Sequence, residues 1–106
     1  MLKSIAIKYF ESWSNKELPK ISELLHEDCR LEDWNTNLNS KTKIIELNKD
    51  FFNKNEIELT INDLVENKNK VWANISIKIN NDEYLDVIDI LTFSENKIIK
   101  IKAFKG

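Results

Sequence analysis

Three polar side chains stand in rows of the sequence that are otherwise apolar: Tyr9, Asp33 and Asp89. Asp89 is the clearest case, because it is the sole carboxylate in an alternating apolar row, and a lone buried carboxylate is costly. Phenol and carboxyl groups can transfer protons or hold a polar ligand atom. The three positions therefore predict a polar spot in an apolar interior, where proton transfer is chemically feasible.

Each of these residues also has an ordinary structural interpretation. A tyrosine in the apolar stripe of a helix usually lies in the core with its hydroxyl at the rim, where one partner satisfies it. Asp89 could form an ion pair with a lysine of a neighbouring strand. Asp63 shares its expected face with Ile57 and Val65, and we interpret it as a turn former near a bend. The sequence alone is compatible with both the structural and the chemical role of these residues.

Other reactive residues are scarce. His26 and Cys29 are the only histidine and the only cysteine, so we expect no metal site and no intrachain disulfide. His26 lies where we expect a helix to end, which favours a contact with the helix dipole over catalysis. A nucleophile assisted by His26 has no supporting spacing. The single cysteine and the absence of a signal-like segment favour a cytoplasmic location.

Helical periodicity governs the first half of the chain. Apolar residues at helical spacing predict one helix over about residues 2–13, and a second, shorter helix with Pro19 in its first turn. A third helix is expected from Ser40 as N-cap to about Asn53, with these residues toward a core: Ile44, Ile45, Leu47, Phe51 and Phe52. A short strand is expected at 29–34, between the second and third helices.

The period changes from 3.6 to 2 in the second half. Alternating residues predict strands over about 56–66, 70–80, 83–93 and 97–105, joined by short turns rich in asparagine. Helices followed by a run of antiparallel strands indicate an α+β domain over residues 1–106. A net charge of -2 argues against nucleic-acid binding, and no stretch is apolar enough to span a membrane.

Five stretches carry a family pattern: Tyr9-Phe10-Glu11, Lys16-Glu17-Leu18, Glu27 to Asp33, Val87 to Phe93, and Ile98 to Phe104. Together they resemble the SnoaL-like and ketosteroid-isomerase-like branch of the nuclear transport factor 2-like superfamily, over nearly the whole chain. The resemblance implies a cone-shaped α+β roll, in which a curved, mostly antiparallel sheet wraps around three N-terminal helices and encloses a pocket.

The resemblance also implies roles for the three polar residues. Tyr9 matches an oxyanion-hole donor, Asp33 the general base, and Asp89 a second donor that ketosteroid isomerases keep protonated. It implies a small, apolar carbonyl ligand, with no cofactor and no metal. Expected substrate-binding residues are Trp13, Trp34, Phe52, Ile101, Ala103 and Lys105.

Two departures from the family pattern affect this reading. Trp34 follows the expected base, where the isomerases have proline, and Lys105 replaces an aromatic residue of the pocket. If Lys105 points inward with Ile99, Ile101 and Ala103, it could keep Asp89 ionised. An ionised carboxylate accepts hydrogen bonds and cannot donate one to an oxyanion.

The superfamily offers two rivals to an isomerase or cyclase. One is a non-catalytic ligand-binding or protein-association module of the same fold. The other is the limonene-epoxide-hydrolase variant, which needs an Asp–Arg–Asp network, whereas Arg30 is expected to face outward. In either case we expect a homodimer through the outer face of the sheet, which should carry Trp72, Ile88, Ile90 and Phe104.

Overall fold

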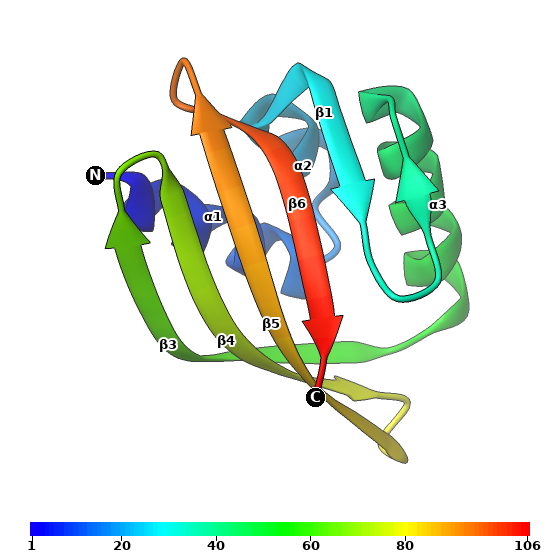
Figure 1. Cartoon of the computed structure of the whole chain (residues 1–106). Helices are drawn as coiled ribbons and strands as arrows, with labels where there is room; N and C mark the ends of the chain where they lie inside the picture. Colours follow the sequence, from blue (N-terminus) through cyan, green and yellow to red (C-terminus); the bar gives the residue numbers. More distant parts are fainter.

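Three helices and six strands make up the structure, a computed structural model that describes all residues from Met1 to Gly106. In chain order the elements are α1 (Leu2–Ser14), α2 (Leu18–Leu24), β1 (Leu25–Glu32), β2 (Asn37–Leu38), α3 (Lys41–Lys54), β3 (Ile57–Asn67), β4 (Lys70–Ile79), β5 (Glu83–Ser94) and β6 (Lys97–Lys105). Figure 1 shows a single curved sheet, with α1 packed against β3 and β4, and α3 against β1. The predicted α+β fold is confirmed.

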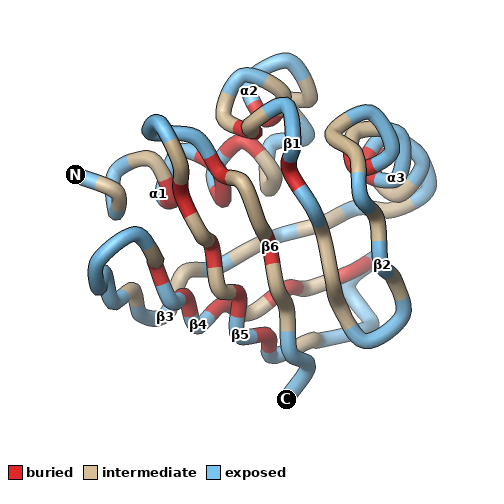
Figure 2. Tube along the Cα trace, turned by 45° about the horizontal axis from the view of Figure 1, so that its top comes forward, coloured by how far each residue is buried: buried red, intermediate tan, exposed pale blue.

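One continuous sheet runs in the order β2-β1-β6-β5-β4-β3. All its neighbouring strands are antiparallel except β1 and β6, which are parallel. Buried and more exposed residues alternate along β4 and β5, as the period of 2 predicts, and Figure 2 shows this alternation along the strands. The inner face of the sheet and the apolar stripes of the helices form the core.

Local sequence signals explain the bounds of the helices. Ser40 Oγ accepts a hydrogen bond from Lys43 N (3.1 Å), so the predicted N-cap of α3 is confirmed. Pro19 lies in the first turn of α2, where its missing N–H does no harm. Lys16 has a positive φ and its Nζ donates to the Phe52 carbonyl (2.9 Å), which ties the α1–α2 turn to the end of α3. None of the helices has the length and apolar character needed to cross a membrane.

The first strand differs from its prediction. It starts at Leu25 rather than at 29, because Leu25 follows α2 directly in extended backbone. His26 therefore lies in β1, and its predicted place at a helix end is wrong. The strand ends at Glu32, so Asp33 lies in the turn that follows, where its N–H donates to the Thr36 carbonyl (2.9 Å).

Two bulges shift the faces of strands relative to a strict alternation. The pairing of β3 with β4 slips between Ile61 and Asp63, so that Val65 becomes exposed although it was expected beside Ile61 on the inner face. In β6 the slip falls between the partners of Thr92 and Phe93. It makes Ile98 the buried residue, whereas Ile99 was considered for the inner face. An inserted residue breaks the alternation, so that the side chains before it and after it no longer follow one pattern of faces.

Candidate functional site

A cavity of about 300 Å³ lies between the inner face of the sheet and helices α1 and α3. Sixteen of its 21 lining residues are hydrophobic. Tyr9, Asp33 and Asp89 all line it, so the three polar residues singled out in the sequence lie around one cavity. An apolar pocket with a few convergent polar groups is the usual form of a small-molecule site.

Tyr9 is positioned by the apolar stripe of α1. Its side chain is buried, next to the fully buried Phe10, and no protein group forms a hydrogen bond with its hydroxyl. Burial raises the pKa of Tyr9 well above its ordinary value, and the negative charges of Asp89 and Cys29 add to this effect. The phenol therefore stays protonated, with its O–H available to a molecule in the cavity.

Asp89 lies in the middle of β5 and faces the cavity. Its partners across the sheet are Ala73 on β4 and Ala103 on β6, and of these Ala103 lines the same cavity with its short side chain. Asp89 has no salt bridge, and only 8% of its surface is exposed. Burial raises the pKa of Asp89 to about 7, with a further contribution from the negative charge of Asp33. Below that pH the protonated carboxyl can donate a hydrogen bond.

Asp33 reaches the same cavity from the end of β1. The last paired residue of β1, Glu32, lies beside Lys102 of β6. Asp33 follows Glu32, and Ala103, which follows Lys102, pairs with Asp89 on β5. Asp33 therefore lies on the same side of the sheet as Asp89, two strands away. Asn35 N donates to Asp33 Oδ1 (2.8 Å), which holds the carboxylate in a local turn. The other oxygen has no protein partner, and Asp33 is half-buried, so it remains accessible to a ligand in the cavity.

Lys105 does not approach Asp89. Its side chain is exposed, and its Nζ lies 5.8 Å from the centre of the Trp34 ring, in a cation–π arrangement. The backbone of Lys105 pairs with Val87, two residues before Asp89 on β5. The side chain of Lys105 does not line the cavity. The structure thus leaves Asp89 without a cation, and the expected contact of Lys105 with the ligand pocket is not formed.

Four of the other expected substrate-binding residues line the cavity: Trp13, Trp34, Ile101 and Ala103. Phe52 does not, because it is buried in the core with its ring packed edge-on against Trp13 (5.2 Å between ring centres). Its neighbour Phe51 lines the cavity instead. Adjacent residues of a helix point about 100° apart, so a periodicity argument easily exchanges the two.

Asn48 of α3 also lines the cavity, and sequence analysis did not include it among the site residues. Trp13 Nε1 donates to its Oδ1 (3.4 Å), while its Nδ2 is buried without a hydrogen-bond partner. A signal was present in the sequence. Asn48 is spaced by four from Ile44 and from Phe52, so it is a polar residue in the buried stripe of a helix.

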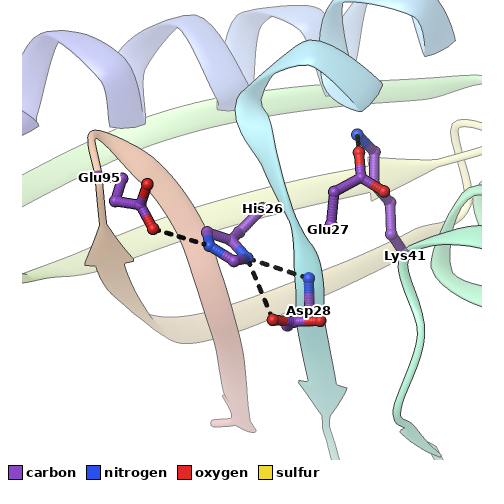
Figure 3. A network of polar contacts seen from close by, with 5 residues as sticks. All are labelled: His26, Glu27, Asp28, Lys41 and Glu95. Carbon is purple, nitrogen blue, oxygen red and sulfur yellow. Dashed lines mark hydrogen bonds and ion pairs between the residues drawn. The ribbon is translucent and has the colours of Figure 1, made fainter.

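His26 belongs to a separate polar network that does not line the cavity (Figure 3). Asp28 N donates to His26 Nδ1 (3.0 Å), which leaves Nε2 to carry the proton toward Glu95, 3.5 Å away. Lys41 pairs with Glu27 nearby (3.2 Å). The network joins β1 to the β5–β6 turn and to the start of α3, which is a structural role.

The remaining reactive residues do not contribute to the cavity. Arg30 is exposed on β1, so the Asp–Arg–Asp network of the epoxide-hydrolase variant is not assembled. Cys29 is buried in the core, and burial raises the pKa of its thiol to about 11. No group of three or more histidine, cysteine, aspartate or glutamate side chains is placed to hold a metal ion.

Comparison with known families gives one match. The family model described as "SnoaL-like domain" matches residues 6–101, which include all three predicted polar site residues. Among curated proteins, no sequence matches the chain significantly.

Solved structures of the same fold share little sequence with this chain. A protein from Kribbella flavida that bears the name "putative ketosteroid isomerase" has a TM-score of 0.91 at 18% identity, covering 99% of this chain and 77% of that one. An NTF2-like protein of unknown function from Cytophaga hutchinsonii has a TM-score of 0.87 at 9% identity, covering 100% and 90%. An LEH-like epoxide hydrolase from M. tuberculosis has a TM-score of 0.86 at 9% identity, covering 97% and 80%. At these identities the likeness concerns the fold alone.

Proposed function

This chain belongs to the SnoaL-like domain family, and from that premise we propose that its cavity binds a small, largely apolar carbonyl compound and abstracts a proton from the carbon next to the carbonyl. One observation carries the proposal. Two buried acidic groups, the Tyr9 phenol and the Asp89 carboxyl, line the cavity without protein partners, while a more accessible carboxylate, Asp33, lines the same cavity.

Each of the three residues has a defined role in the proposed step. The carbon–hydrogen bond breaks, its proton passes to the Asp33 carboxylate, and the electron pair moves into the carbonyl to give an enolate. Tyr9 and protonated Asp89 donate hydrogen bonds to the enolate oxygen. In an isomerisation, Asp33 returns the proton to another carbon of the enolate. In a cyclisation, the enolate carbon attacks a second carbonyl, and Asp33 gives the proton to the alkoxide that forms.

The apolar wall supports this chemistry energetically. Hydrogen bonds to a developing oxyanion are stronger in a dry site than in water, and donors that are already in place need no reorganisation. Ala103, the partner of Asp89 on β6, lines the cavity with a short side chain, which leaves room for a ligand oxygen beside the Asp89 carboxyl group. Removing one donor of this kind typically lowers the rate on the order of 10²–10³-fold.

The test uses 2-tetralone, a two-ring ketone with acidic protons next to its carbonyl. Solvent deuterium incorporation at these carbons is followed by proton NMR at pH 6, with the uncatalysed rate subtracted. Wild-type protein should accelerate the exchange, and Tyr9→Phe should lower that acceleration on the order of 10²–10³-fold. Tyr84→Phe is the matched control, because Tyr84 is exposed and does not line the cavity. Equal rates in the two variants would contradict the proposal.

A ligand-binding protein without catalysis is the second candidate. The same unpartnered donors favour it, because they can hold a ligand oxygen without any proton transfer. Binding of 2-naphthol, a phenol that resembles the enol of 2-tetralone, separates the two. Binding of 2-naphthol without any acceleration of exchange would favour this second candidate over an enzyme.

We also propose that the chain forms a homodimer through the outer face of the sheet. Val65, Trp72, Ile88 and Phe104 are exposed there. The strand register places Val65 opposite Trp72 and Ile88 opposite Phe104, so the patch extends across the sheet. Burial of such a patch against a second copy removes apolar surface from water.

Sedimentation equilibrium at tens of micromolar checks the proposed dimer. Wild-type protein should sediment with twice the mass of the 12.5 kDa chain. Ile88→Lys should shift the protein toward the monomer, because a buried lysine without a partner is costly. Lys8→Glu, at an exposed position of α1 away from this face of the sheet, serves as the control, and a monomeric wild type would refute the proposal.

A further inference from the structure

The side-chain Nδ2 of Asn48 is shielded from water on all sides and has no hydrogen-bond partner in this protein. The residue is 7% exposed and lies on the wall of the cavity, in the buried stripe of α3. Buried polar groups in folded proteins are nearly always hydrogen-bonded, so an exception needs an explanation. A partner that binds in the cavity is one such explanation.

Trp13 determines which way the amide is turned. An indole N–H can only donate, so the amide must present its oxygen to Trp13 Nε1, 3.4 Å away. The opposite orientation would bring two donors together. The amino group of Asn48 is therefore the end that lacks a partner, and it has two hydrogens to donate.

The neighbours of Asn48 explain why no protein group satisfies this donor. Ile44 and Phe52, one turn away on either side, are both buried and apolar. Trp13 follows Tyr9 by one turn of α1, so its bond to Asn48 ties the amide to the helix that carries the proposed oxyanion donor. An acceptor for Nδ2 can thus come from the cavity, from the same ligand that contacts Tyr9.

We propose that Asn48 Nδ2 donates a hydrogen bond to a second oxygen of the ligand, distinct from the carbonyl oxygen held by Tyr9 and Asp89. This inference rests on the proposed function and narrows its substrate class. The ligand is an apolar compound with two oxygen functions, such as a diketone or a hydroxyketone, rather than a simple ketone. Trp13 acts as a positioning residue for the amide.

Naphthalene phenols test the second oxygen directly. The probes are 2-naphthol and its 2,3-, 2,6- and 2,7-dihydroxy relatives, which place a second oxygen at different points of the same two rings. Binding is measured by isothermal titration calorimetry at pH 6. At least one diol should bind wild-type protein about tenfold more tightly than 2-naphthol, the gain of roughly one hydrogen bond. Asn48→Leu should abolish this preference, so that the diol and 2-naphthol bind the variant with similar affinity.

The side-chain NH₂ signals of Asn48 provide a second measurement, which needs no variant to fold. In the wild-type protein these ¹⁵N-correlated signals should shift on addition of the preferred diol and much less on addition of 2-naphthol. Trp13→Phe, which removes the indole donor and keeps an aromatic ring, should reduce the preference for the diol.

Each negative outcome is distinct. Wild-type protein that binds 2-naphthol but no diol more tightly contradicts the role of Asn48, and so does a preference that survives Asn48→Leu. Either result leaves the proposed proton abstraction standing. Wild-type protein that binds none of the four phenols contradicts the proposed function itself, and the role of Asn48 falls with it.

Discussion

The concave face of the sheet has two ends that are built differently. At one end, around α2 and the β5–β6 turn, the core is closed, and these side chains are fully buried: Ile21, Leu25, Leu91 and Ile98. At the other end the same strands line a cavity, and the polar groups of Tyr9, Asn48 and Asp89 lie among apolar walls.

The difference concerns polar groups as well as packing. Only three polar or charged residues are buried in this protein, Ser12, Asn48 and Asp89, and two of them line the cavity. Closing the second end with apolar side chains would remove the cost of burying a carboxyl group without a partner and an amide NH₂ group without an acceptor. Features that lower stability and persist at one end of a sheet are typical of a functional site.

The largest effect is expected at the cavity end, on catalysis. Asp33→Asn should lower the proposed proton abstraction on the order of 10²–10⁴-fold, because an amide cannot accept the proton. Stability should change little, since the amide oxygen can still accept the Asn35 N–H bond. Deuterium exchange into 2-tetralone measures the rate, and urea unfolding measures the stability.

Asp63→Asn is the matched control for Asp33→Asn. Asp63 is also a carboxylate that bonds to a nearby backbone N–H, but it is exposed on β3 and lies outside the cavity. The exchange rate should match that of wild type. A loss of rate in the Asp63 variant as large as in the Asp33 variant would remove the distinction between the two ends.

Two leucines of β5 compare the ends by stability. Leu91 is fully buried at the core end, so Leu91→Ala should destabilise the protein by about 2–5 kcal/mol. Leu85 is half-buried on the cavity wall, and Leu85→Ala should cost at most about 1 kcal/mol, because it enlarges an existing space. Urea unfolding of both variants measures the difference. Similar losses would mean that the cavity end is packed as tightly as the core.

Asp89→Asn tests the charge state of the cavity through stability. A folded-state pKa of about 7, above the unfolded value near 3.9, means that the unfolded chain loses its proton first. Wild-type protein therefore loses stability, by roughly a few kcal/mol at most, as the pH rises from about 4 to about 7. The amide mimics the neutral acid and avoids this loss.

Melting temperatures at pH 5 and pH 8 measure this effect. The advantage of Asp89→Asn over wild type should be larger at pH 8 than at pH 5. A variant that is clearly less stable than wild type at pH 8, but similar to it at pH 5, would show that Asp89 is a structural anion.

Most of the fold could be predicted from the sequence, because its signals are local. Asparagine-rich turns and strict alternation give β4, β5 and β6 within one residue of their observed bounds, and the Ser40 cap marks the start of α3. The start of β1 could not be predicted, since α2 passes into extended backbone at Leu25 without a breaking residue.

The candidate site could be predicted only in part. Tyr9 and Asp89 are visible as polar residues in apolar rows, but the direction of Lys105 depends on Trp34, which lies in a distant turn and reaches it only in the folded chain. The bulges at Asn62 and Ile99 leave no mark in the alternation, so Val65 and Ile99 were assigned to the wrong side. The direction of Lys105 and the positions of the two bulges both depend on contacts between residues that are distant in the sequence.

The smallest effect is expected at the core end, on cysteine reactivity. Cys29 is fully buried, and its thiol pKa of about 11 keeps it protonated at pH 8. Iodoacetamide should leave the folded protein unlabelled at pH 8 and label it fully in urea. Mass spectrometry measures the extent of labelling. Rapid labelling of Cys29 in the folded protein would show that the core end opens to solvent and is not closed.

The state of the Asp89 carboxyl tests the central claim of this account most directly, because only the neutral acid can donate to an oxyanion. A ¹³C NMR titration of the aspartate carboxyl groups, with Asp89→Asn used to assign the signal, should give Asp89 a midpoint at about 7. Burial and the neighbouring Asp33 produce this rise. A midpoint near the ordinary value of about 3.9 would show an ionised carboxylate at neutral pH and contradict its role as a donor.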